Sequence, residues 1–316
     1  MSPGPPPLAG ADHVSAVLRR LTWMQAEGIW PDGTRYLWTD AFGVVLLCSL
    51  ADATGQGHFL DRAERLVADV DSVLGRSPGY RIGEAADRDG QYFHYLTVWA
   101  FALGVLGARR TGYHERALEL VRAVHGPFVI PGRGIWWKMS EDLSGPYPGY
   151  GLGGLDPFQA RAVYRFLDAG TGVLAAELDD LAGLIEPVWR DLVITQDLGL
   201  GMMLWSARRC RDEAWAAEHE DRSLAVLDRM WVDPPGYVCR EPGAPGVLFA
   251  FTNYGVALGL QAAECHQDRV EAIIARFDTY RAGDHYDRDA ITHVMGCVAR
   301  LPGAFLTDNA ATTLGL

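Results

Sequence analysis

The sequence predicts an all-α fold built from two layers of helices, and three observations support this prediction. Apolar residues recur at helical spacing along almost the whole chain, and no long segment alternates in the manner of a β-strand. Helices that are apolar all round alternate with helices that carry a single apolar stripe. These pairs repeat at roughly fifty residues, as in arrays of helix pairs. We therefore expect a buried inner layer and an amphipathic outer layer.

The segment 87–106 shows the inner type of helix most clearly. An acidic and aromatic head precedes an apolar run from Phe93 to Leu106, in which only His94 and Thr97 are strongly polar. A helix without a polar face is buried along its length, so its chemistry is expected at its N-terminal end. Further inner helices are expected at 41–53, from 156 onward, and at 196–210, 254–264 and 284–300.

The segment 59–74 shows the outer type, because Ala63, Val67 and Val70 form one apolar stripe and charged residues occupy the other face. Outer helices of this type are also expected at 12–27, 114–125, 172–190, 212–231 and 268–281. Six helix pairs of this kind fit a closed ring, the (α/α)6 barrel. We expect it to form a single domain over 12–316, after a disordered Pro/Gly-rich tail at 1–11.

Composition excludes several classes of function. The chain has 316 residues, a formal net charge of -12 and no basic patch, so a nucleic-acid partner is not expected. The N-terminal residues do not resemble a signal peptide, and the apolar runs look too short to span a bilayer, so no membrane partner is expected. The cysteines are widely spaced, which predicts a reduced, cytoplasmic protein without disulfides or a zinc site. They are Cys48, Cys210, Cys239, Cys265 and Cys297.

Four strings, at 36–43, 87–97, 137–140 and 289–295, resemble a family of (α/α)6 barrels in the six-hairpin glycosidase-like superfamily. They are scattered over most of the chain. The resemblance implies the barrel fold and glycoside hydrolysis, lysis or epimerisation at the mouth of the barrel. It implies no catalytic role for any individual residue, and one superfamily contains many chemistries.

Polar residues gather where the inner helices are expected to begin, and barrel closure would bring them to one rim. The candidate catalytic residues are Asp40, Asp89, His94 and Asp289, because glycoside cleavage needs an acid and an ionised partner. Aromatic rings among them could stack on the C–H face of a sugar. The candidate substrate-binding residues are Trp38, Tyr92, Trp136, Trp137, Lys138, Tyr150, Asp156, Asn253, Tyr254, Asp287 and His293. A small-molecule or oligosaccharide substrate is therefore expected, with no metal and no cofactor.

Simpler interpretations of these residues remain open. Aspartate is a favoured helix cap, and Asp156, which precedes a proline, suits that role best. His94 and His293 could be core histidines or could transfer protons. Lys138 could bind an anion or be a solvated surface residue. The long loop 126–155, with its tryptophans and tyrosines, is expected to cover part of the site as a lid.

Two other functions remain open at this stage. An aspartic acid in an aromatic-lined cavity could serve a terpenoid-type or other natural-product cyclase, since aromatic faces stabilise cations. The chain could also be a sugar-binding module without activity. The leading prediction is a glycoside hydrolase that uses aspartate acid–base chemistry.

Overall fold

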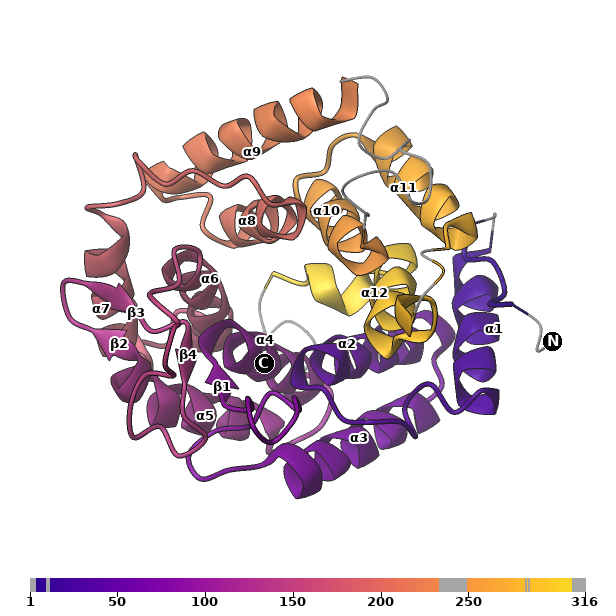
Figure 1. Cartoon of the computed structure of the whole chain (residues 1–316), viewed down its shortest axis with the longest axis horizontal. Helices are drawn as coiled ribbons and strands as arrows, with labels where there is room; N and C mark the ends of the chain where they lie inside the picture. The colour runs from indigo at the N-terminus through magenta and orange to yellow at the C-terminus, as the bar shows by residue number, and fades with distance from the viewer. Residues whose placement is uncertain (1–3, 10–11, 233–248, 282, 284, 309–316) are drawn as a thin grey trace. The chain divides into compact units, whose positions relative to one another are not determined.

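A computed structural model of the chain describes residues 4–9, 12–232, 249–281, 283 and 285–308. Within these residues the structure contains twelve α-helices, and the β-structure is limited to two-residue strands and isolated bridges (Figure 1). The chain divides into two compact units, which are described separately. The first unit contains 1–33 and 193–306, and the second is built mainly from 34–192. The prediction of one domain over 12–316 stays a prediction.

The second unit consists of three helix pairs. Within it α2 contacts α4 and α4 contacts α6, while α3, α5 and α7 each pack on the preceding helix (Figure 1). This is the expected alternation of inner and outer helices. The helices are α2 (Leu37–Thr54), α3 (His58–Leu74), α4 (Phe93–Gly107), α5 (Tyr113–Phe128), α6 (Asp156–Asp168) and α7 (Ala175–Ile185).

The inner helices α2 and α4 are buried on every side, as their composition predicts. In α4 every residue from Leu96 to Gly107 is buried. By length and composition alone α2 could cross a membrane, which corrects the expectation that no apolar run is long enough. However, 83% of that helix is buried inside the structure, as in the core helix of a globular unit.

Two short antiparallel ladders organise the long loop and were not expected from the sequence. Strand β1 (Gln91–Tyr92), directly before α4, pairs with β4 (Lys138–Met139), so that Tyr92 lies opposite Lys138. Strand β2 (Val129–Ile130) pairs with β3 (Gly134–Ile135). The loop between α5 and α6 is therefore anchored to the N-terminal end of α4.

The first unit contains the remaining helices. Here α10 contacts α8, α11 and α12, while α9 packs on α8 and α1 on α12. Helices α8 and α10 approach backbone to backbone, because a Cβ atom at Gly201 would lie 2.2 Å from the carbonyl oxygen of Gly255. The elements are α1 (His13–Ala26), α8 (Asp197–Arg209), α9 (Ala214–Val232), α10 (Ala250–Ala262), α11 (Gln267–Thr279) and α12 (Ala290–Arg300), with 3₁₀-helices η2 (His285–Arg288) and η3 (Gly303–Leu306).

The described part of the N-terminal segment is packed, in contrast to the disordered tail expected at 1–11. Leu8 is fully buried. The backbone N–H groups of Leu8 and Ala9 donate to Oδ2 of Asp278, at 2.6 and 2.5 Å. Arg20 Nε donates to the carbonyl oxygen of Pro6 at 2.7 Å. The ion pair of Arg20 in α1 with Asp278 in α11 therefore holds this segment in place, although its Pro/Gly composition suggested disorder.

Two of the cysteines are buried thiols of low reactivity. Burial raises the pKa of Cys48 and of Cys297 to about 12, so neither forms a thiolate near neutral pH. Cys239 lies outside the described residues.

Candidate functional site

In the second unit, the N-terminal ends of α2, α4 and α6 and the anchored loop bring together six of the fifteen predicted site residues. Aromatic contacts link these ends to the anchored loop. We refer to this set as the aromatic–carboxylate cluster. Its members are Trp38, Tyr92, His94, Trp137, Tyr150 and Asp156.

The pair formed by His94 and Asp156 is the chemically distinctive part of the cluster. Asp156 Oδ1 lies 3.7 Å from His94 Nδ1, and the two side chains are 5% and 19% exposed. Neither atom has a hydrogen-bond partner among the residues that the structure describes. A buried carboxylate oxygen without a donor is costly, so such an atom marks a place where a ligand hydroxyl or a proton could be bound.

Asp156 is not the helix cap that its position before Pro157 suggested. It is the first residue of α6, and no side chain caps that helix. Its carboxyl group packs directly against the backbone of Gly153, where a Cβ atom would lie 1.9 Å from Oδ2. The glycine therefore makes the space that this carboxyl group occupies.

Trp137 forms an aromatic surface next to this pair. Its ring is parallel to that of His94, with an interplanar angle of 9° and centroids 5.8 Å apart, and the residue is 39% exposed. Tyr92 and Tyr150 pack against Trp137 at 5.2 and 5.4 Å. Trp136 lies within the same loop, where it forms a β-bridge with Leu152. An exposed indole ring held in this way is suited to stacking on a ligand.

Lys138 is the only lysine in the sequence, and the structure encloses it completely, with a side chain that is 0% exposed. Its Nζ atom donates to the carbonyl oxygen of Arg88 at 2.6 Å and to Glu84 Oε2 at 3.1 Å. The Nζ atom also lies 4.4–5.0 Å from the centres of three tyrosine rings, Tyr92, Tyr147 and Tyr150. Cation–π attraction and hydrogen bonds thus hold the loop. This corrects the interpretation of Lys138 as a solvated residue, and its predicted role in substrate binding stays a prediction.

Asp89 and Asp40 are buried and have partners of their own. Asp89 Oδ1 accepts hydrogen bonds from the backbone N–H groups at positions 82, 83 and 90, and Oδ2 accepts one from Arg81 at 3.0 Å. These bonds assign Asp89 to fixing the loop before β1. Asp40 Oδ1 lies 3.3 Å from Arg35 Nη1, and its Oδ2 accepts from the Tyr36 N–H at 3.2 Å. The catalytic roles of both aspartates stay predictions.

Tyr36, Tyr95 and Glu84 also belong to this region, and Tyr36 and Glu84 were not candidates from the sequence. The hydroxyl oxygens of Tyr36 and Tyr95 are 2.5 Å apart. Burial, followed by the neighbouring Tyr36, raises the pKa of Tyr95 well above its ordinary value. Burial and a hydrogen bond with Tyr150 likewise raise the pKa of Tyr92. These phenols therefore stay protonated and can act as hydrogen-bond donors.

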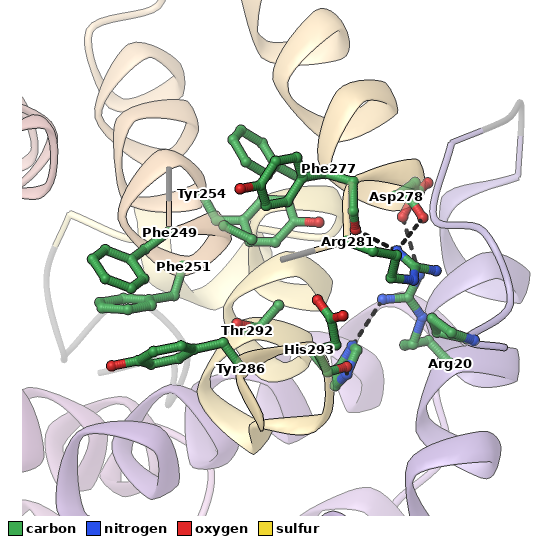
Figure 2. Close-up of a pocket in the computed structure, with 14 residues that line it drawn as sticks. Arg20, Phe249, Phe251, Tyr254, Phe277, Asp278, Arg281, Tyr286, Thr292 and His293 are labelled. Atoms are coloured by element: carbon green, nitrogen blue, oxygen red, sulfur yellow. Dashed lines mark hydrogen bonds and ion pairs between the residues drawn. The ribbon is translucent and has the colours of Figure 1, made fainter. Parts of the chain in front are cut away.

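The other predicted site residues lie in the first unit, where Tyr254, Asp287 and His293 line a small pocket. Figure 2 shows Tyr254 and His293 at this pocket. Asp289 precedes α12, and its side chain makes no capping hydrogen bond. Asn253 lines a different, largely apolar pocket. Its Nδ2 atom donates to the Phe249 carbonyl oxygen at 2.9 Å.

His293 is a structural histidine with a defined tautomer. Nδ1 lies 3.2 Å from Arg20 Nη1, which can only donate, so Nδ1 is the acceptor. Nε2 therefore carries the proton and donates to the Asp287 carbonyl oxygen at 3.0 Å. Burial and then the charge of Arg20 lower the pKa of His293 to about 3. With both ring nitrogens engaged and the ring neutral, His293 is not suited to the proton transfer considered for it.

No cluster of three or more His, Cys, Asp or Glu side chains suited to a metal ion occurs within the described ranges. The side chains of the cluster in the second unit offer acid–base groups, hydrogen-bond donors and stacking surfaces. These are the elements that recognition and cleavage of a polar ring compound require.

Comparisons with solved structures identify the fold. The chain matches an alpha-1,6-mannanase of Salegentibacter sp. HEL1_6, solved as an inactive double aspartate-to-asparagine variant in complex with alpha-1,6-mannotriose. The TM-score is 0.53 and the identity 12%, and the match covers 87% of this chain and 90% of the other. It also matches an unsaturated glucuronyl hydrolase specific for heparin, with a TM-score of 0.53 and 11% identity, over 86% of this chain and 87% of the other.

Both proteins are members of the six-hairpin glycosidase-like (α/α)6 superfamily. This chain has their fold. The fold class predicted from the sequence is thereby confirmed. No protein-family model matches the chain. No curated protein matches it either. Because the identity is so low, the likeness concerns the fold and not the chemistry.

Proposed function

We propose that the protein is a carbohydrate-active enzyme, a glycoside hydrolase, that acts at the aromatic–carboxylate cluster. The observation that carries the proposal is the buried Asp156 carboxyl group, which lies 3.7 Å from His94 beside a partly exposed tryptophan ring. A sugar has an apolar C–H face and a polar edge, so a stacking ring and an adjacent acid are the two groups that cleavage needs. The names of two proteins whose solved structures share this fold, a mannanase and a glucuronyl hydrolase, describe enzymes that act on saccharides. This supports a saccharide as the substrate of the present chain.

In this proposal each residue has a defined role. Trp137 stacks on the sugar ring, and Asp156 delivers the proton to the oxygen of the bond that breaks. His94, whose Nδ1 atom lies 3.7 Å from Asp156 Oδ1, positions that carboxyl group. The second carboxylate that such a reaction requires is Asp40, in the first turn of α2, whose charge is balanced by Arg35 at 3.3 Å.

The test is hydrolysis of a panel that includes alpha-1,6-mannotriose and unsaturated glucuronyl disaccharides, with the released sugars separated by chromatography. Asp156→Asn keeps the shape of the side chain but removes the acid, so we expect a loss of about a hundredfold or more in rate with an unchanged melting temperature. Asp179→Asn, at an exposed position of α7, is the matched control.

Two results would contradict the proposal. One is a wild-type protein that cleaves no member of a broad glycoside panel. The other is an Asp156→Asn protein that retains full activity. Saturable binding without any cleavage would assign the chain to the sugar-binding modules without activity.

A further inference from the structure

Helices α4 and α6 pack along a seam that begins at the proposed catalytic pair. At the N-terminal end of this seam, His94 Nδ1 of α4 lies 3.7 Å from Asp156 Oδ1 of α6. Ten residues further along each helix, a Cβ atom at Gly104 would lie 2.9 Å from Cε1 of Phe166. Because both contacts keep the same register, the two helices run in the same direction and face one another along the seam.

Gln159 lies on this seam, between the two contacts. It follows Asp156 by three residues and precedes Phe166 by seven. Residues at these spacings share one face of an α-helix. Long side chains of a helix point back toward its N-terminus. The amide group of Gln159 is therefore directed along the seam toward Asp156.

The side chain of Gln159 is buried without a hydrogen bond. The residue is 3% exposed, and its Nε2 atom has no partner among the residues that the structure describes. An amide group that leaves water without a partner costs free energy. One turn earlier on the same face, Asp156 Oδ1 is a buried acceptor that also has no partner within the described part of the chain. The seam thus contains a donor and an acceptor, one helical turn apart, that could satisfy each other.

The ionisable groups next to Asp156 are few. His94 is its basic neighbour, and no arginine or lysine of the described ranges forms an ion pair with it. On the same helix, Arg161 donates to a backbone carbonyl oxygen of α7 at 2.7 Å. Between α5 and α7, His125 Nε2 lies 3.4 Å from Asp180 Oδ2.

The groups from α2 and from the anchored loop already have partners of their own. Arg35 lies 3.3 Å from Asp40 and balances its charge. Lys138 is enclosed by its own contacts, and burial raises the pKa of Tyr92, so this phenol stays protonated. The charge of an ionised Asp156 therefore depends on hydrogen-bond donors of the seam.

We propose that Gln159 is a positioning residue for Asp156, and that Gln159 Nε2 donates a hydrogen bond to Oδ1 of the ionised carboxyl group. The role of Asp156 as the acid rests on the proposed function. In that reaction Asp156 gives its proton to the oxygen of the breaking bond and keeps the electron pair of its O–H bond, so it becomes a carboxylate. A hydrogen bond to the charged form stabilises the carboxylate as it forms.

The experiment follows the Asp156 carboxyl carbon by NMR over a range of pH, in protein labelled with carbon-13 aspartate. Its signal is identified by its loss in Asp156→Asn. Gln159→Met keeps the length of the side chain and removes the donor. We expect the titration midpoint of Asp156 to rise by about one pH unit in this variant, since a carboxylate that has lost a donor holds its proton more tightly. Gln56→Met, at an exposed position of the same unit, is the matched control and should leave the midpoint unchanged.

Gln159→Glu is a second test that keeps the shape of the residue. It places another carboxyl group on the seam, so we expect the two carboxyl groups to titrate as a coupled pair, in two steps more than about one pH unit apart. The melting temperature of each variant is recorded as well. Because the Gln159 amide has no partner within the described ranges, Gln159→Met should melt at or above the wild-type temperature.

A midpoint that Gln159→Met leaves unchanged would overturn the inference. So would independent titration of the two carboxyl groups in Gln159→Glu. The titration uses no substrate, so a shifted midpoint in a protein that cleaves no glycoside would refute the proposed hydrolysis alone. In an active enzyme, the high-pH limb of the kcat/KM profile should move with the midpoint in Gln159→Met, and an unmoved limb would contradict the role of Gln159 in the reaction.

Discussion

Replacement of Gly153 by alanine tests the position of the Asp156 carboxyl group without altering Asp156 itself. A Cβ atom at Gly153 would lie 1.9 Å from Oδ2 and 2.5 Å from Cγ of Asp156. Ordinary contacts begin at 3.4 Å, so the carboxyl group must move by about 1.5 Å to accommodate the methyl group. Gly153 has no positive φ angle, so the backbone itself tolerates alanine.

A displacement of about 1 Å at a catalytic group can reduce the rate about a hundredfold. We therefore expect Gly153→Ala to lose about two orders of magnitude in kcat/KM while it remains folded. Gly154→Ala is the matched control, because its Cβ atom would meet only Leu192, at 3.5 Å.

The assay is hydrolysis of the substrate found in the glycoside panel, with circular dichroism and melting temperature recorded for both variants. A Gly153→Ala protein as active as Gly154→Ala would refute the role of the Asp156 carboxyl group. A fall in activity that follows a fall in melting temperature would point to structural damage instead.

Two further substitutions test contacts outside this pair. Lys138→Met removes the ammonium group from a fully buried site and leaves Glu84 unpaired. We therefore expect the free energy of unfolding, measured by urea titration, to fall by about 2 kcal/mol or more. The control is Arg133→Met at an exposed position, which should leave the free energy of unfolding unchanged. Because His293 is neutral when folded but has an ordinary pKa when unfolded, its contribution to stability is present above pH 6.5 and is lost as the pH falls toward 3. His293→Gln should remove about 2 kcal/mol of the pH dependence of unfolding between pH 7 and pH 5, and an unchanged pH dependence would contradict the lowered pKa of His293.

The helical layers could be predicted from the sequence because their signals are local. A helix that is apolar all round, such as α4, has no stable position except inside the structure, and the stripe of α3 must face such a helix. The N-terminal ends of the inner helices were predictable for the same reason. His94 and Asp156 lie at such ends, so the sequence alone could identify them as candidates.

The partners of the candidate residues could not be predicted, because they come from segments distant in sequence. The sequence placed Asp89 among the catalytic candidates but could not show that three backbone N–H groups and Arg81 contact its oxygens. The enclosure of Lys138 depends on β1 pairing with β4, and two-residue strands leave no periodic signal. Composition likewise suggested a loose N-terminal segment, whereas the long-range contact of Leu8 with Asp278 holds it in place.

The enclosure of the only lysine gives this chain an unusual chemical property. Amine-acylating reagents such as succinimidyl esters need an accessible, unprotonated ε-amino group, and the Lys138 side chain is 0% exposed in the folded protein. Acylation of Lys138 therefore requires the three tyrosine rings and Glu84 to separate from it. The labelling rate at this one residue thus reports how often the loop between α5 and α6 opens. A ligand that stacks on Trp137 should slow that opening, so peptide mapping of a single modified lysine would detect ligand binding without any knowledge of the reaction.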